Sequence, residues 1–290
     1  MPATWTVRGR AVMLDRPLVM GIVNVTPDSF SDGGLTLSPE RALECASSLV
    51  EDGADIIDIG GESTRPGAHA VTEREELERV LPVIIAVRGA HPHVLLSVDT
   101  VKSGVADAAA REGVHIVNDV SGMRLDDRMA AVCAQHRVGV VLMHSRGGVS
   151  DMANYSHAVF DGDVVDVVLE ELRARLAHAL DAGIARNAIA LDPGIGFGKQ
   201  SMHSLRLLGC MRRLAGEGFP LVVGASRKRF IGELTGEEEA NRRVFGSVGA
   251  AVAAYERGAA ILRVHDVAAT RQALDVAAAI RAAASGCTSA

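Results

Sequence analysis

Polar and ionisable residues stand at the ends of successive apolar segments in this sequence. Nearly every segment finishes with a side chain that carries charge or forms strong hydrogen bonds: Asn24, Asp58, Asp99, Asn118 with Asp119, His144, Asp192, Ser226 with Arg227 and Lys228, and Arg263 with His265. An unpaired charge that is buried among apolar groups is costly, so such a regular set is not accidental. The residues predict a shared binding site in which their charges find partners.

Three of these residues are suited to accepting hydrogen bonds. Asp99 and Asp192 are acceptors when ionised, and Asn118 both donates and accepts. Ionised carboxylates accept strong, paired hydrogen bonds from neighbouring N–H groups. The three residues therefore predict a ligand that is rich in N–H donors, such as an amino-pyrimidinone ring.

The last two apolar segments are followed by positive charge. Lys228 comes two residues after Ser226, and Arg263 is separated from His265 by one residue. An arginine stays charged at physiological pH and binds a phosphate through two parallel hydrogen bonds. These residues predict an anion site, with Arg263 as its main clamp.

The histidines do not predict a zinc site. His144 and His265 are the candidates at segment ends, and they do not form a trio of metal ligands at a suitable spacing. Magnesium is commonly bound by one or two protein oxygens together with substrate phosphates. We therefore expect any magnesium ion to be held by Asn24 and by a phosphorylated substrate.

Three loops are rich in glycine. Residues 26–34 and 60–67 follow the first two apolar segments, and their glycines permit the backbone freedom that closure over a ligand requires. Residues 192–199 contain three glycines and a lysine, which superficially resembles a phosphate-binding loop. Gln200 stands where that motif has a hydroxyl residue, which argues against a nucleotide triphosphatase.

The apolar segments predict eight strands, because they are short and nearly continuous, as in a parallel sheet that is buried on both faces. They cover residues 18–25, 55–59, 94–99, 115–119, 139–144, 188–192, 221–225 and 260–265. Segments of helical periodicity alternate with them, at residues 42–52, 73–88, 102–112, 129–136, 163–182, 204–216, 246–257 and 269–284.

This alternation predicts a (β/α)8 TIM barrel, an α/β fold in which the carboxyl ends of all strands share one face. The mean spacing between strands is about 35 residues, which suits one βα unit. Residues 4–14 predict a short β-hairpin with Gly9 at its turn, and one domain spans residues 1–290. A doubly wound open sheet is the alternative, but the first strand lacks the glycine fingerprint that follows it in dinucleotide-binding folds.

The composition excludes several classes of protein. The 290 residues include 30 Lys and Arg and 36 Asp and Glu, giving a net charge of −6, with 48% hydrophobic and 3% aromatic residues. Wholesale disorder is excluded, and neither nucleic acid nor membrane is an expected partner, since there is no basic stripe and no apolar stretch of about 20 residues. Four scattered cysteines without a close pair indicate a cytoplasmic protein.

Eight motifs resemble, in order, those of the dihydropteroate synthase family of pterin-binding enzymes. They lie at residues 20–34, 58–67, 97–100, 118–122, 142–144, 192–199, 224–228 and 263–267. The resemblance covers residues 18–270, and the first motif is highly specific on its own. Residues 145–155 depart from the family pattern without removing a residue that we expect in the site.

The resemblance implies a transferase of folate biosynthesis that uses Mg²⁺ and forms a homodimer through its last helices. Such an enzyme joins 4-aminobenzoate to 6-hydroxymethyl-7,8-dihydropterin diphosphate and releases diphosphate. The implied pterin-binding residues are Asp99, Asn118, Asp192 and Lys228, and the implied diphosphate-binding residues are Asn24, Arg263 and His265. The aminobenzoate pocket, where sulfonamides compete, is implied to be bordered by Phe30, Thr64, Arg65, Pro66, Phe197 and Ser226.

The chemistry favours an SN1-like displacement, because an arylamine is a weak nucleophile and the barrier falls mainly when diphosphate leaves easily. We expect the catalytic residues to be Asp99, Lys228, Arg263 and His265. Two alternatives stay open. A pterin-binding methyltransferase domain has no use for a diphosphate clamp, and a catalytically inactive homologue is separated from a synthase only by an assay.

Overall fold

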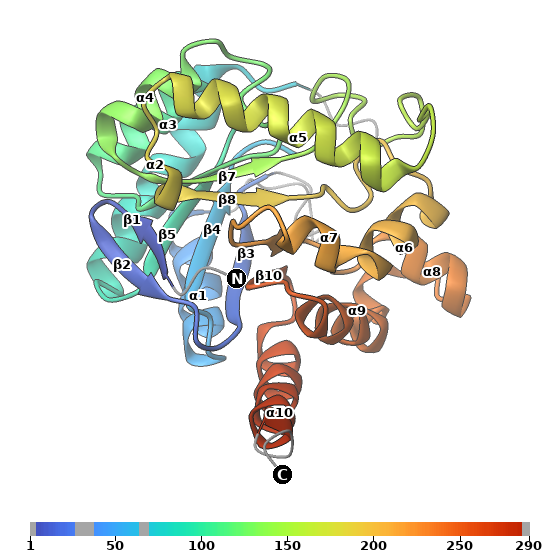
Figure 1. Ribbon diagram of the computed structural model, residues 1–290. Coiled ribbons are helices and arrows are strands. Elements are labelled where there is room, and N and C mark those ends of the chain that lie inside the picture. The colour runs from blue at the N-terminus through green and yellow to red at the C-terminus, as the bar shows by residue number, and fades with distance from the viewer. Residues whose placement is uncertain (1–3, 27–37, 64–69, 286–290) are drawn as a thin grey trace.

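The computed structural model describes residues 4–26, 38–63 and 70–285, and it confirms the TIM barrel (Figure 1). Eight parallel strands form one sheet in the order β8-β7-β6-β5-β4-β3-β10-β9. Their bounds are β3 Leu18–Asn24, β4 Ile56–Gly60, β5 Leu95–Asp99, β6 Ile116–Asp119, β7 Gly139–Met143, β8 Ile189–Asp192, β9 Val222–Val223 and β10 Ile261–Val264. A parallel bridge between Leu191 and Leu221 joins β8 to the start of β9 and closes the ring.

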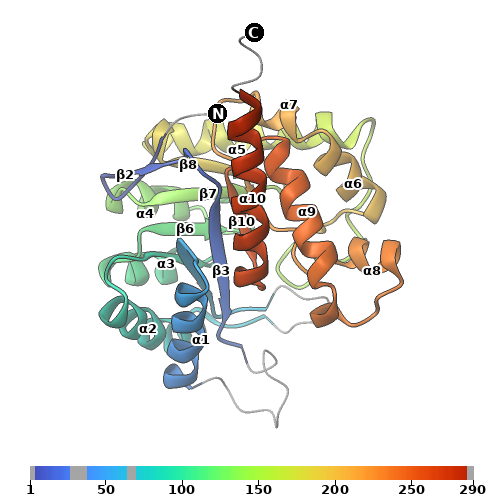
Figure 2. The same ribbon diagram turned by 90° about the horizontal axis from the view of Figure 1, so that it is seen from below.

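Helices surround this ring, as the alternation of segments predicts (Figure 1). They are α1 Pro39–Glu51, α2 Glu73–Ala90, α3 Ser103–Arg111, α4 Met129–His136, α5 Val164–Asp181, α6 Ser201–Gly209, α7 Met211–Ala215, α8 Arg229–Thr235, α9 Val244–Glu256 and α10 Val267–Ser285. Figure 2 shows α10 and α1 packed beside β3. In the described ranges, none of the helices combines the length and the apolar character that a membrane span requires.

Two predicted elements need correction, and one helix was not predicted. The single helix expected at residues 204–216 is two helices, because the backbone leaves helical geometry at Cys210. The strand expected at residues 221–225 is only Val222–Val223, since Gly224 and Ser226 turn toward the pocket described below. The sequence analysis missed α8, a short helix that begins directly after Lys228.

Local sequence signals explain where many helices start and stop. Thr72 and Glu75 form a reciprocal capping box at the start of α2, in which each side chain accepts from the other's backbone N–H. Five helices are followed by a glycine with positive φ, namely Gly53, Gly113, Gly183, Gly236 and Gly258. This left-handed conformation ends a helix at little steric cost only when the residue is glycine.

The amino-terminal end of the barrel is sealed by the predicted hairpin, formed by β1 (Thr4–Val7) and β2 (Arg10–Met13). Trp5 is fully buried there, and its indole N–H donates to the Ala188 carbonyl at 2.8 Å. Trp5 and Val7 pack with inward-facing apolar residues of the strands, such as Met20 and Ile116. Side chains therefore fill the barrel interior at its amino-terminal end, and the face formed by the carboxyl ends of the strands is left for a ligand site.

Candidate active site

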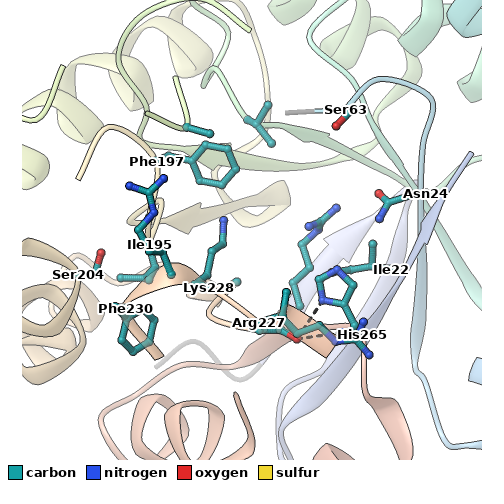
Figure 3. A pocket seen from close by; sticks show the side chains of 18 of the residues that line it. Ile22, Asn24, Ser63, Ile195, Phe197, Ser204, Arg227, Lys228, Phe230 and His265 are labelled. Carbon is teal, nitrogen blue, oxygen red and sulfur yellow. Dashed lines mark hydrogen bonds between the residues drawn. The ribbon is translucent and has the colours of Figure 1, made fainter. Parts of the chain in front are cut away.

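One pocket of about 660 Å³ opens where the carboxyl ends of the strands converge (Figure 3). Every predicted site residue that lies in the described ranges lines it: Asn24, Asp99, Asn118, Asp192, Phe197, Ser226, Lys228, Arg263 and His265. The other predicted residues, Phe30, Thr64, Arg65 and Pro66, lie outside the described residues. The barrel therefore gathers side chains from six different strands or strand ends, as the sequence pattern predicts.

Two buried carboxyl groups give the pocket its acceptor side. Burial raises the pKa of Asp192 to about 6, although a hydrogen bond from the Gly194 N–H at 2.7 Å, together with Lys228, opposes this shift. Burial also raises the pKa of Asp99 to about 7, and the neighbouring Arg263 opposes it. Both carboxyl groups are thus poised to change protonation near neutral pH, where a ligand with N–H donors favours the ionised form.

Arg263 lies between the acceptor side and the rest of the pocket. Its Nε atom is 2.6 Å from Asp58 Oδ2, and its Nη2 atom is 2.7 Å from Asp99 Oδ2. Asn118 also donates to Asp58 Oδ2, at 3.0 Å. Arg263 is therefore held in place by two carboxylates before any anion arrives.

Asp58 is a residue that the sequence analysis noted at a strand end without giving it a role. It is fully buried, and its second oxygen, Oδ1, has no hydrogen-bond partner among the described residues. A buried acceptor without a partner is expensive, so its negative charge depends on Arg263 and Asn118. Asp58 thus connects Arg263, which is predicted to bind diphosphate, with Asn118, which is predicted to bind the pterin.

Lys228 and Phe197 face one another across the pocket (Figure 3). The Lys228 ammonium lies 3.9 Å from the centre of the Phe197 ring, a cation–π contact. Burial lowers the pKa of Lys228 to about 8, and the positive charge of Arg263 contributes to the shift. Lys228 precedes the first residue of α8, so the newly found helix sets its position.

Ser226 and His265 join the ends of β9 and β10. The Ser226 hydroxyl lies 3.0 Å from His265 Nδ1 and accepts the His265 backbone N–H at 3.2 Å. Arg227 behaves differently from its neighbours, because its guanidinium forms two hydrogen bonds with Asp266. Arg227 and Lys228 both follow the apolar segment at residues 221–225, and of these two Lys228 is the one directed toward Phe197.

His144 lies beneath the pocket and does not line it. Burial, with the nearby Lys199, lowers the pKa of His144 to about 3, so its ring is neutral. The ring bridges Lys199 Nζ, at 2.8 Å from Nδ1, and Glu171 Oε2, at 3.0 Å from Nε2. Lys199 also lines the pocket and is 1% exposed, a burial that the glycine-rich sequence before it does not reveal.

No group of three or more histidine, cysteine, aspartate or glutamate side chains in the described ranges is arranged to hold a metal ion. A magnesium ion that binds mainly to substrate phosphates needs fewer protein ligands than such a cluster supplies. Asn24 offers a carboxamide oxygen, a hard donor of the kind that magnesium accepts, in the same pocket as His265 and Arg263. The donor set of the pocket therefore fits a magnesium ion that arrives with a diphosphate.

Fold and site together define a TIM-barrel enzyme whose pocket sets carboxylates against cations. The model of the pterin binding enzyme family matches residues 20–265. The dihydropteroate synthase of Neisseria meningitidis serogroup C is 45% identical over 274 residues, covering 93% of this chain and 95% of that protein. The Bacillus subtilis dihydropteroate synthase is 44% identical over 256 residues, covering 87% and 85%.

Solved structures give the same result. Xanthomonas albilineans dihydropteroate synthase with 4-aminobenzoic acid has a TM-score of 0.90 and 47% identity, covering 97% of this chain and 99% of that one. Yersinia pestis dihydropteroate synthase with a sulfonamide drug has a TM-score of 0.90 and 42% identity, covering 96% and 99%. This chain belongs to the pterin-binding enzyme family, among its dihydropteroate synthases, which confirms the resemblance found in the sequence.

Proposed function

We propose that the pocket joins 4-aminobenzoate to 6-hydroxymethyl-7,8-dihydropterin diphosphate, giving 7,8-dihydropteroate and diphosphate. The observation that carries this proposal is the division of one pocket into a carboxylate side and a cation side, with Arg263 between them. Structures of relatives with 4-aminobenzoate and with 7,8-dihydropteroate support it. The chain would therefore act as a transferase in folate biosynthesis.

The pterin ring is bound by Asp99, Asn118, Asp192 and Lys228. Asp192 accepts hydrogen bonds from adjacent ring and amino N–H groups, since its carboxylate is buried in the lining of the pocket. Asn118 is oriented by Asp58, which fixes which atoms of its amide are presented to the ring. The ligand's N–H donors stabilise the charged carboxylates that burial alone disfavours.

The diphosphate is bound by Asn24, Arg263 and His265. Arg263 carries a permanent charge, and the hydrogen bond with Ser226 orients the His265 ring. A magnesium ion bound between Asn24 and the substrate would supply further positive charge to the diphosphate oxygens. These groups lower the free energy of the departing diphosphate more than that of the intact substrate, which is the condition for catalysis.

The aminobenzoate is bound next to the pterin, with Phe197 and Ser226 as its described borders. Phe30, Thr64, Arg65 and Pro66 belong to the same pocket in this proposal. A flat aromatic acid suits the ring of Phe197 and the hydroxyl of Ser226. Sulfonamides, which share this shape, are expected to compete for the same pocket, and the Yersinia pestis relative has been solved with one.

The displacement proceeds by an SN1-like route. The bond between the pterin methylene carbon and the diphosphate oxygen breaks first, and both electrons leave with diphosphate. Asp99 offsets the positive charge that develops on the pterin, which Lys228 also binds, while Arg263 and His265 stabilise the leaving group. The amine nitrogen then bonds to the methylene carbon and loses its proton to water or diphosphate.

The test is an assay of magnesium-dependent diphosphate release, with 7,8-dihydropteroate identified by mass spectrometry. Release that needs both substrates supports the synthase. No release from folded protein would contradict it and would favour an inactive homologue. Transfer of a methyl group from a folate to a corrinoid protein would instead favour the pterin-binding methyltransferase.

The same proposal includes a cytoplasmic homodimer formed through the last helices. Val276 and Ile280 on α10 are 57% and 65% exposed, an apolar pair that a second copy would cover. Cys45, Cys133 and Cys210 are free thiols, as expected in a reducing compartment. Light scattering should give a mass near twice 30.4 kDa, and a mass near that of one chain would exclude the dimer.

A further inference from the structure

Lys199 is a buried lysine to which the pterin, diphosphate and aminobenzoate sites proposed above assign no role. It follows the glycine-rich loop after β8, and its side chain turns back beneath the pocket. Its Nζ atom lies 2.8 Å from His144 Nδ1, 2.9 Å from the Phe197 carbonyl oxygen and 3.3 Å from the His144 carbonyl oxygen. Three acceptors match the three N–H groups of a lysine ammonium.

These contacts connect two loops that belong to different strands. His144 directly follows β7, whereas Phe197 lies in the loop that follows β8. The His144 ring continues the connection to Glu171 on α5, whose carboxylate also accepts from Arg146 Nε at 3.0 Å. The lysine is therefore linked through His144 to α5 in the outer layer of helices.

The backbone of the loop after β8 is packed tightly against the end of β7 near Lys199. Gly194 has a positive φ, and a Cβ atom built on it would lie 1.9 Å from the His144 carbonyl oxygen. The backbone must therefore pass directly against the end of β7. Lys199 joins the two segments at this point, because its amine donates to the carbonyl oxygens of both His144 and Phe197. The Phe197 ring faces the Lys228 ammonium in the pocket.

We propose that Lys199 is a positioning residue that holds the Phe197 backbone, and through it the aromatic wall on which 4-aminobenzoate binds. The Phe197 carbonyl oxygen accepts a hydrogen bond from the Lys199 amine. Loss of the amine therefore removes a contact that fixes the backbone of Phe197, whose ring forms this wall. The pterin-binding carboxylates do not depend on that bond, because Asp192 is tied separately to the Gly194 N–H. This assignment rests on the proposed synthase activity.

Lys199→Met tests it, because methionine keeps the apolar stem and removes the amine. The KM for 4-aminobenzoate should rise about tenfold, the effect of losing one strong buried hydrogen bond at the wall. The KM for the pterin diphosphate should rise less than the KM for 4-aminobenzoate, because Lys199 acts on the pterin-binding Asp192 only through its charge and makes no hydrogen bond to it. In Lys199→Gln, which keeps an NH₂ donor group, the rise should be smaller.

A double variant separates positioning from general destabilisation. If Lys199 acts through Phe197, adding Lys199→Met to Phe197→Leu should not raise the aminobenzoate KM further. Arg175→Met is the matched control, because Arg175 donates to the Met143 and Ser145 carbonyls at the same strand end and pairs with Glu171 at 3.6 Å, but makes no hydrogen bond to the loop after β8. It should lower Tm and leave the aminobenzoate KM unchanged.

Three results would overturn the proposal. Lys199→Met could raise the KM for the pterin diphosphate as much as the KM for 4-aminobenzoate, or it could raise the aminobenzoate KM further when added to Phe197→Leu. Arg175→Met could also raise the aminobenzoate KM as much as Lys199→Met does. A crystal structure of Lys199→Met is a readout without turnover, and an unmoved Phe197 would also overturn it. If Lys199→Met does not fold, Lys199→Gln takes its place in each measurement. Absent turnover in the unsubstituted protein would speak against the synthase activity, while the crystal structure would still decide the role of Lys199.

Discussion

The two ends of the barrel contain opposite kinds of side chain. At the amino-terminal end, the hairpin seals the interior with Trp5 and Val7, and the buried groups there are apolar. At the carboxyl-terminal end, Asp58, Asp99 and Asp192 are buried or nearly so, and burial raises the pKa of the last two. One end therefore supplies hydrophobic stabilisation, while the other holds charges whose energies improve when a ligand binds.

This comparison separates residues that stabilise the fold from residues that act on a ligand. A substitution at the sealed end should lower the free energy of unfolding and leave the kinetics of the folded fraction unchanged. A substitution at the open end should change the kinetics, and it should also lower the free energy of unfolding where it leaves a buried partner unpaired, as Arg263→Ala does with Asp58.

The largest effect is expected from Trp5→Ala at the sealed end. Removing a buried indole should lower the free energy of unfolding by about 3–5 kcal/mol, because it leaves a cavity and removes the hydrogen bond to Ala188. Urea denaturation measures this loss, and both KM values of the folded protein should be unchanged. Val12→Ala, at a half-buried hairpin position, is the control and should cost about 1 kcal/mol or less. Similar losses in the two variants would show that the indole does not seal the barrel.

The second effect is expected from Arg263→Ala at the open end. The kcat/KM for the pterin diphosphate should fall about 10²- to 10³-fold, because the leaving group loses its permanent cation. Arg263→Lys keeps the charge without the paired hydrogen bonds to Asp58 and Asp99, so it should lose less. Steady-state kinetics decide between these outcomes, and unchanged values in Arg263→Ala would remove this residue from the diphosphate site.

A third effect concerns the acceptor side of the pocket. Asp192→Asn should weaken pterin binding about 10- to 100-fold, since an amide cannot accept hydrogen bonds from two adjacent N–H groups. Asp126→Asn is a suitable control, because Asp126 also accepts backbone N–H groups but does not line the pocket. Calorimetry with a pterin should show weaker binding only in the first variant, and equal affinities would contradict the proposed contact.

The sequence predicts the sealed end and the open end unequally well. Alternating strand and helix periodicity is a local property, so it predicts the barrel and places Asp99, Asn118, Asp192 and Arg263 on one face. The roles of Asp58 and Lys199 depend instead on long-range contacts with Arg263 and His144, respectively. No local pattern encodes such pairs.

The boundaries that were wrong have a related cause. The strand near residue 223 ends early, and the unpredicted α8 begins directly after Lys228, because the chain there turns to form the pocket. Hydrophobic periodicity reports burial against the barrel, and it gives no signal where the backbone is shaped by the pocket. The segments in which sequence and structure differ most are thus close to the ligand site.

The smallest expected effect is a pH dependence that distinguishes the two sides of the pocket itself. The kcat/KM for the pterin diphosphate should fall as the pH drops through about 7 and 6, because Asp99 and Asp192 take up protons and lose acceptor strength. It should also fall as the pH rises through about 8, because Lys228 loses its charge. The expected profile is therefore bell-shaped, with its maximum between pH 7 and 8.

Lys228→Arg tests whether the fall in kcat/KM at alkaline pH comes from loss of the charge on Lys228. A guanidinium stays charged far above pH 8, so the alkaline fall should disappear while the acid fall remains, even if the maximum rate is lower. Asp192→Asn should instead flatten part of the acid side and leave the alkaline fall in place. An alkaline fall that persists in Lys228→Arg would assign it to another group, and the contact between Lys228 and Phe197 would then be a packing feature of the wall.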